Sequence, residues 1–241
     1  MIIERQMAKK DFSKTVLLIH GPPKIGKTTF AHALGEYTGK PALMIMTEDG
    51  TGALDACAVR VTTKVGLDKL LESLDRQRKE LSEQYSCIVV DLINEVDAMI
   101  FDWICDQKNI STVSELPHGQ GWSLYQNEYK KVLAKILGLG LPVKFICHSK
   151  ASTESSLGDK NHTKQSPQSN SPKMKLHLMG KADAICFMKP NGTTTSVCFK
   201  PSPFYDAGTR FKSIANDYSF NIDDPLDTVK NISDDFAGTK E

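Results

Sequence analysis

The chain has 241 residues, of which 40% are apolar and 24% are charged, and its formal net charge is +1. This composition is typical of a globular protein in water, and the length suits one large domain or one domain with insertions. The near-neutral balance excludes a global basic field that would draw the chain to nucleic acid, so any such contact has to come from a local basic patch.

Membrane and zinc sites are not indicated. No apolar run approaches the roughly 18 residues that a bilayer-spanning helix needs, and residues 1–10 are too polar for a secretory signal. The six cysteines form no C-x-x-C pair, which argues against zinc. Four of them lie in apolar runs, where a reduced, buried thiol is usual. We therefore expect a cytoplasmic protein with no membrane partner.

The strongest signal is a phosphate-binding loop near the start of the chain. An apolar run at residues 15–19 precedes the spacing G-x-x-x-x-G-K-T, and residues 29–37 have a helical pattern. In such a strand–loop–helix unit the backbone N–H groups face an anion, and the helix N-terminus adds a partial positive charge. The residues expected to bind the nucleotide are Gly21, Pro22, Pro23, Lys24, Ile25, Gly26, Lys27, Thr28 and Thr29.

The cofactors predicted from this loop are ATP and Mg²⁺. Lys27 would reach the β- and γ-phosphates, which places it among the catalytic residues, and the Thr28 hydroxyl would ligate Mg²⁺. A second apolar run ends in Asp91. A carboxylate at the C-terminal end of a parallel strand lies where phosphates bind, so Asp91 is expected to hold the same Mg²⁺. Taken alone, Asp91 could equally cap the next helix.

Short apolar runs along the chain indicate the fold class. They predict strands at residues 16–20, 42–47, 87–93, 143–148 and 184–188, and helical spacing predicts helices at 67–81, 95–103 and 122–137. Strands that are apolar on both faces and alternate with helices indicate an α/β fold, with a mostly parallel central sheet and helices on both faces. Residues 193–200 alternate in polarity and predict an additional edge strand, which could be antiparallel.

We divide the chain into an N-terminal extension (1–14), an ATPase domain (15–216) and an acidic C-terminal tail (217–241). Two loop-like stretches interrupt the domain, at 106–121 and at 150–173. The second is so polar that burial cannot offset the entropy of ordering it, and we expect it to be mobile. The aspartate-rich tail is expected to be poorly ordered as well.

The group that activates water is indicated by position only. Many P-loop ATPases have a glutamate directly after the Mg²⁺ aspartate, but Leu92 occupies that place here. Glu48 directly follows the run at residues 42–47 and would lie at the same edge of the sheet as Asp91, so it is the predicted catalytic carboxylate. Glu95 and Asp49 remain rivals.

His148 directly follows the apolar run at residues 143–147 and could contact the γ-phosphate. The polar segment that follows carries lysines, which suggests a contact with single-stranded DNA that ATP controls. A solvated surface loop is the alternative interpretation, and the segment has no aromatic residue on which bases could stack. The lysines predicted to contact nucleic acid are Lys150, Lys160, Lys164 and Lys173.

Three other functions fit a phosphate loop. A small-molecule kinase would need an arginine-bearing lid, and the long polar segment has no arginine. A GTP switch is suggested by the D-G-T-G sequence at 49–52, but no N-K-x-D follows the strand at 143–148. A nucleotide-gated adaptor, such as a helicase loader, would use the same loop without needing fast hydrolysis.

The chain resembles the RecA-like P-loop ATPases of bacteriophages, a group of phage nucleotide-binding proteins that includes Sak-type single-strand annealing proteins. The resemblance extends from about residue 15 to about residue 210. It depends on an ordered set of segments, which are G-P-P-K-I-G-K-T-T at 21–29, T-E-D-G at 47–50, C-I-V-V-D at 87–91, H-G-Q-G-W at 118–122, F-I-C-H-S at 145–149, G-K-A-D-A at 180–184 and Y-D-A-G-T-R at 205–210.

This resemblance implies a RecA-like core with Glu48 as catalytic carboxylate and His148 as γ-phosphate sensor. It also implies that the two loop-like stretches face single-stranded DNA during annealing or strand exchange, often beside a phage single-strand-binding protein. Some members form rings or filaments with ATP between subunits, where Lys181 or Arg210 would complete a neighbour's site. From the given sequence we expect no separate N-terminal oligomerisation domain of the kind found in bacterial recombinases.

Overall fold

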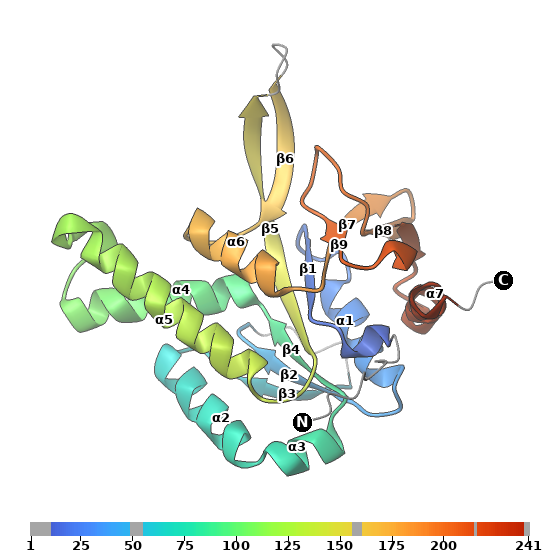
Figure 1. The fold of residues 1–241 in the computed structure, drawn as a ribbon, viewed down its shortest axis with the longest axis horizontal. Helices are drawn as coiled ribbons and strands as arrows, with labels where there is room; N and C mark the ends of the chain where they lie inside the picture. Colours follow the sequence, from blue (N-terminus) through green and yellow to red (C-terminus); the bar gives the residue numbers. More distant parts are fainter. Residues whose placement is uncertain (1–10, 49–54, 156–160, 215, 239–241) are drawn as a thin grey trace, which may run out of the picture.

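The computed structural model describes residues 11–48, 55–155, 161–214 and 216–238. Its centre is one sheet in the order β10-β8-β7-β1-β5-β4-β2-β3, in which the strands from β7 to β3 are parallel neighbours (Figure 1). The strands along this path are β1 (Leu17–Gly21), β2 (Ala42–Met46), β3 (Cys57–Arg60), β4 (Cys87–Asp91), β5 (Val143–Ser155), β7 (Ala184–Asn191), β8 (Thr194–Cys198) and β10 (Asp217–Phe220).

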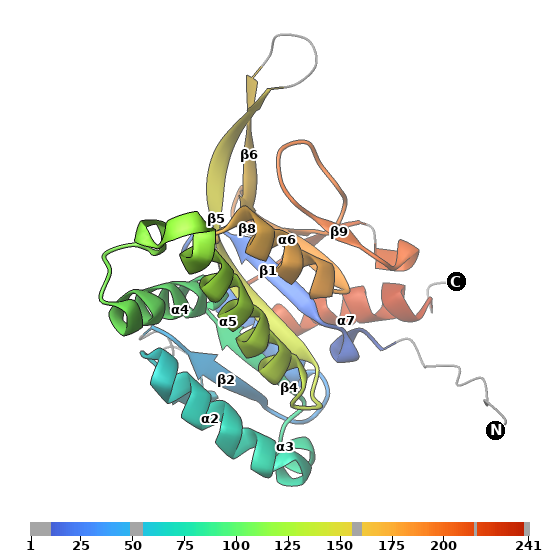
Figure 2. The same ribbon diagram turned by 60° about the vertical axis from the view of Figure 1, so that its left-hand side comes forward.

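Helices cover both faces of this sheet (Figures 1 and 2). One face packs against α2 (Lys64–Arg76), α4 (Ile93–Lys108), α5 (Gln120–Leu137) and α6 (Pro172–Lys181). The other packs against α1 (Lys27–Glu36), α7 (Pro225–Ala237) and the short 3-10 helix η1 (Phe12–Lys14). These observations confirm the predicted α/β class.

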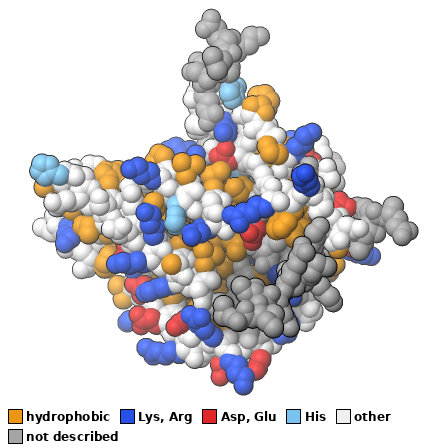
Figure 3. All heavy atoms as spheres, in the orientation of Figure 1, with side chains coloured by type: hydrophobic (Ala, Val, Ile, Leu, Met, Phe, Trp, Pro, Cys, Tyr) orange, Lys and Arg blue, Asp and Glu red, His pale blue; other side chains and the backbone are white. Residues whose placement is uncertain are grey.

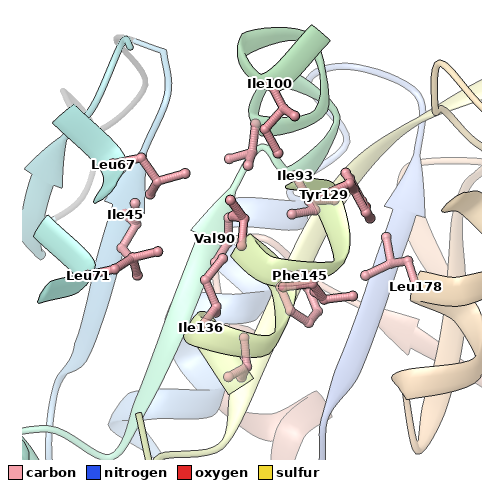
Figure 4. Close-up of a cluster of buried hydrophobic side chains, with 14 of the residues drawn as sticks. Ile45, Leu67, Leu71, Val90, Ile93, Ile100, Tyr129, Ile136, Phe145 and Leu178 are labelled. Atoms are coloured by element: carbon pink, nitrogen blue, oxygen red, sulfur yellow. The ribbon is translucent and has the colours of Figure 1, made fainter. Parts of the chain in front are cut away.

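Strand alternation decides which side chain joins which core. Leu18 packs on the side of α2, α4, α5 and α6, whereas its neighbours Leu17 and Ile19 pack on the side of α1 and α7. Figure 4 shows the first of these cores, where Val90 and Phe145 of the sheet meet apolar side chains of the covering helices. Because the central strands are buried on both faces, their sequences read as continuous apolar runs.

Most predicted elements are present, with shifted ends. The single helix expected at 67–81 is two helices, α2 and α3 (Arg78–Gln84), because the backbone at Gln77 leaves the helical region. The strand expected at 87–93 ends at Asp91, and α4 begins at Ile93. The strand expected at 193–200 is β8, which is antiparallel to β7, but β10 lies outside it.

The two predicted loops are corrected by the structure. In the first, α4 continues to Lys108, and two short 3-10 helices, η2 (Val113–Glu115) and η3 (Pro117–Gly119), lead into α5. The second is largely an antiparallel hairpin between β5 and β6 (Asn161–Pro167), which projects from the body of the molecule (Figure 2). Cross-strand hydrogen bonds replace the apolar contacts that the sequence lacks.

The predicted acidic tail is also wrong, because residues 217–238 belong to the core. Strand β10 extends the sheet by pairing with β8, and helix α7 packs against α1. Four apolar residues of this segment are buried, namely Phe220, Val229, Ile232 and Phe236, and aspartates lie between them in sequence. Phe12, which the sequence assigned to the N-terminal extension, is buried against Phe236, so the described part of that extension, residues 11–14, contributes to the same core.

Two small elements complete the fold. They are β9 (Gly208–Thr209), which pairs with β7, and the 3-10 helix η4 (Lys212–Ile214). Within the described residues, no helix combines the length and the apolar character that a membrane crossing requires.

Candidate functional site

The predicted phosphate loop connects the C-terminal end of β1 to the start of α1. Gly26 precedes the helix at φ +88°, a left-handed conformation that favours glycine. A Cβ on Gly21 would lie 2.4 Å from the carbonyl oxygen of Met188, so a side chain has no room there. Because the N-cap residue of α1 is Gly26, which has no side chain to cap the helix, the first N–H groups of α1 remain available to an anion.

Lys27 is held beneath this loop, with only 5% of its surface exposed. Its Nζ donates hydrogen bonds to the carbonyl oxygens of Gly21 at 3.1 Å and Pro22 at 2.6 Å, and lies 3.5 Å from Nδ1 of His148. Burial lowers the pKa of Lys27, while the carboxylates of Asp91 and Glu48 raise it. The ammonium group is therefore fixed beside the position where the loop would hold a phosphate chain.

Thr28 and Asp91 are brought together from different elements. Oγ1 of Thr28, in the first turn of α1, donates a 2.7 Å hydrogen bond to Oδ2 of Asp91, the last residue of β4. Burial raises the pKa of Asp91, and the bond from Thr28 together with the charge of Lys27 opposes that shift. A hydroxyl and a carboxylate oxygen are hard ligands of the kind that Mg²⁺ prefers, so these residues fit the predicted metal.

Thr47 joins the ends of β2 and β4, a role that the sequence did not indicate. Its backbone N–H donates to the carbonyl oxygen of Asp91 at 2.8 Å, and its Oγ1 accepts from the N–H of Leu92 at 2.8 Å. Glu48 is the next residue and lines the same cavity as Lys27 and Asp91. The end of β2 is thus tied to the end of β4, the strand that carries Asp91.

The two rivals of Glu48 differ from it in position. Glu95 accepts a 2.9 Å hydrogen bond from Nδ2 of Asn94, and it does not line the cavity. Its pKa is raised by burial and then by the charge of Glu48, so the two carboxylates are near one another. Asp49 lies outside the described residues.

His148 lies in β5 at the point where the strand leaves the sheet for the hairpin. Its backbone N–H donates to Oδ1 of Asn94 at 3.0 Å, a second contact that the sequence did not indicate. Burial, followed by the nearby Lys27, lowers the pKa of His148. A neutral imidazole here can donate or accept a hydrogen bond from the cavity that it lines.

These side chains surround a cavity of about 480 Å³, a size that suits a small ligand. Residues 23–29 of the phosphate loop line it, as do Met46, Glu48, Asp91, Leu92, His148 and Ile222. Ile222 belongs to the segment that the sequence predicted as a tail. No pattern in the sequence placed it here, because the contact depends on the pairing of β10 with β8.

The lysines predicted to contact nucleic acid do not form one group. Lys150, in β5, and Lys173, in α6, are exposed. Lys164, in β6, is bound to the Asp206 carboxylate with 3.0 Å between Nζ and Oδ1. Lys160 lies outside the described residues.

Lys181 and Arg210 are the residues that the family resemblance suggests for a neighbour's site. Arg210 forms hydrogen bonds with Asp183 at 3.2 Å and with the carbonyl oxygen of Gly180 at 3.0 Å, and Lys181 is exposed.

Comparison with known proteins gives a family. The family model described as "AAA domain" matches residues 13–211. The crystal structure of a KaiC-like protein from the hyperthermophilic archaeon Pyrococcus horikoshii OT3 is similar with a TM-score of 0.47 and 14% sequence identity, over 88% of this chain and 87% of that one. No curated protein matches the chain.

Proposed function

The chain belongs to the AAA domain family, and from this premise we propose that it is a Mg²⁺-dependent, RecA-like ATPase that acts on single-stranded DNA. The contact of Thr28 with Asp91 beside the buried Lys27 supports this proposal most directly. It brings two hard oxygen ligands and a fixed cation together at the mouth of a phosphate-binding loop. Such an arrangement favours a metal–triphosphate over other small ligands.

The chain's own residues would divide the work of hydrolysis. The loop N–H groups and Lys27 would hold the β- and γ-phosphates, and Glu48 would orient and deprotonate the attacking water. His148 would form a hydrogen bond with the γ-phosphate. When bound between Thr28 and Asp91, Mg²⁺ would supply positive charge that offsets the charge developing on the phosphates.

The DNA-binding part of the proposal depends on the hairpin and the adjoining helices. The hairpin begins directly after His148 and carries the exposed Lys150. Lys and Arg side chains are spread over the face that carries α5 and α6 (Figure 3), and α6 has no acidic residue. We propose that this surface binds the phosphates of a single strand during phage recombination or annealing. A phage single-strand-binding protein, and further copies of this chain, are the proposed partners.

The ATPase assignment is tested by Lys27→Ala. The expected result is loss of ATP hydrolysis to the background rate, with an unchanged thermal unfolding midpoint, because the contacts of the lost amine, with the carbonyl oxygens of Gly21 and Pro22 and with His148, all lie at the edge of the cavity. Lys69→Ala, at an exposed lysine of α2, is the control. Hydrolysis by Lys27→Ala at the rate of the control would contradict the proposal.

Fluorescence anisotropy with a labelled oligonucleotide tests the DNA assignment. The double variant Lys150→Glu/Lys173→Glu should bind at least about tenfold more weakly than the parent, and the dependence of affinity on salt should become shallower because fewer counterions are released. A matched control places the same charge reversals at the exposed Lys69 and Lys79 of α2 and α3. Equal affinities for the two double variants would reject this DNA-binding surface.

A nucleotide-gated adaptor, such as a helicase loader, is the second candidate function. It is favoured by the buried Leu92 that follows Asp91 in place of a glutamate. The rate of ATP hydrolysis with and without single-stranded DNA separates the two functions. A recombination ATPase should be stimulated by the strand and lose that stimulation as salt rises, whereas an adaptor should bind ATP and turn it over slowly in both conditions.

A further inference from the structure

Ile222 is an apolar side chain exposed beside a charged cavity. It lies in the connection between β10 and α7, and 54% of its surface is exposed. A Cβ placed on Gly26 would lie 3.3 Å from Cδ1 of Ile222, so the side chain adjoins the phosphate loop. Apolar surface in water is unfavourable, and a ligand that covered Ile222 would remove part of that cost.

The order of strands places Ile222 on one side of the loop and the metal-binding end of the cavity on the other. The loop follows β1. Asp91 and His148 come from β4 and β5, which lie on one side of β1, whereas Ile222 follows β10, beyond β7 and β8 on the opposite side. A triphosphate in the loop with its terminal phosphate towards Asp91 and His148 would therefore direct its nucleoside towards Ile222.

The segment that carries Ile222 is held in place by the fold. Phe220 pairs with Thr195 of β8, is buried, and packs edge-on against Phe30 of α1 with 5.5 Å between ring centroids. On the other side of Ile222, Oγ1 of Thr228 donates a 2.9 Å hydrogen bond to the carbonyl oxygen of Ser219. A surface fixed on both sides loses little conformational entropy when a ligand packs against it.

A second cavity, of about 390 Å³, is also lined by this side chain. Both cavities are lined by Pro23, Lys24, Ile25 and Ile222, and the second adds polar groups from Thr194 and Asp223. A nucleobase has two apolar faces and a polar edge. An aliphatic wall next to polar side chains matches that division.

We propose that Ile222 packs against the base of the bound nucleotide and forms the nucleoside end of the site. This inference rests on the proposed function, since it requires that the loop holds a nucleoside triphosphate. It assigns a ligand-binding role to a segment outside the residues that match the family model, which end at 211.

The test compares a nucleotide with a ligand that has phosphates but no nucleoside. Titration calorimetry with Mg²⁺ would measure the binding of the imido analogue of ATP and of inorganic tripolyphosphate to the full chain. The Ile222→Ser variant should bind the nucleotide analogue roughly fivefold to twentyfold more weakly than the parent, because apolar contact is lost, and its affinity for tripolyphosphate should be unchanged. The Ile222→Phe variant should bind the nucleotide analogue more tightly and tripolyphosphate as the parent does.

Leu226→Ser is the matched control, because Leu226 is exposed to 42%, lies one turn further along the chain and lines neither cavity. It should bind both ligands as the parent does. Equal nucleotide affinity in Ile222→Ser and the parent, or equal weakening of both ligands, would overturn the inference while the proposed function stands. A parent protein that binds neither ligand would overturn the proposed function and this inference with it.

Discussion

Thr28 and Asp91 are separated by 63 positions in the chain, yet the hydroxyl of one donates a 2.7 Å hydrogen bond to the carboxylate of the other. The proposal that these residues bind a metal can therefore be tested at a single atom, Oγ1 of Thr28. Thr28→Val removes that oxygen with little change of shape, whereas Thr28→Ser keeps it. We expect Thr28→Val to lower the rate of ATP hydrolysis by about a hundredfold and to require more Mg²⁺ for half-maximal rate, with Thr28→Ser close to the parent. Rates measured across a Mg²⁺ titration would decide, and equal rates for the two variants would count against a metal ligand at this position.

Conservative substitutions also distinguish Glu48 from Glu95 as the residue that activates water. Glu48→Gln keeps the size of the side chain but removes the base, so hydrolysis should fall by about a hundredfold or more while nucleotide binding persists. Glu95→Gln should retain most activity, because Glu95 does not line the cavity. Single-turnover hydrolysis and nucleotide affinity should be measured for both variants. A larger loss in Glu95→Gln would reverse the assignment.

His20 predicts a dependence of stability on pH. The ring is buried next to the phosphate loop, and its Nε2 donates to the carbonyl oxygen of Asp206 at 2.5 Å while Nδ1 accepts from Ser149 Oγ at 2.8 Å. Burial lowers the pKa of His20 to about 4; Asp206 opposes this shift, and Lys27 and Lys175 add to it.

Because the pKa of His20 is lower in the folded chain than in the unfolded chain, the unfolded chain binds more protons between about pH 6.5 and about pH 4. The free energy of unfolding should therefore fall by about 3 kcal/mol as the pH falls through that window. Urea denaturation at several pH values would show a smaller fall in His20→Gln than in the parent. Parallel curves for the two proteins would refute the assignment.

Phe236 tests whether the C-terminal segment is part of the core. It is buried and packs against Phe12 and Phe211, with ring centroids 5.7 and 4.6 Å apart. Phe236→Ala should lower the free energy of unfolding by about 3–4 kcal/mol. Leu226→Ala, on the exposed side of the same helix, should cost less than about 1 kcal/mol. Similar small losses for both variants, measured by urea denaturation, would mean that α7 contributes little to stability.

The sequence predicted five parallel strands, β1, β2, β4, β5 and β7, because their central residues are buried on both faces and read as apolar runs. It did not predict the parallel edge strand β3, whose residues are mostly exposed. The same reasoning failed where stability comes from partners distant in the chain. In β6 it comes from hydrogen bonds to β5, and in α7 from a few buried residues spaced among aspartates. Low apolar content therefore did not imply a loop in either segment.

For the candidate site, the phosphate loop, Asp91, Glu48 and His148 were predicted from their places at strand ends, which a parallel sheet brings to one edge. Thr47 and Asn94 were not predicted, because a side chain that positions its neighbour has no spacing pattern of its own. To predict that Ile222 lines the cavity, one would have had to know that β10 pairs with β8. The pairing of Lys164 with Asp206 likewise depends on the hairpin register and on a segment some 40 residues later in the chain.

Strand β5 runs without a break from Val143 in the sheet to Ser155 in the hairpin. Successive side chains of a strand point to opposite faces, so the orientation of His148 fixes which hairpin residues face each side. Deleting one residue between His148 and Lys150 would invert that assignment for the rest of β5. Inserting or deleting two residues would keep the same side chains on each face. The spacing between His148 and the projecting hairpin therefore determines which face each hairpin side chain occupies, in addition to how far the hairpin extends.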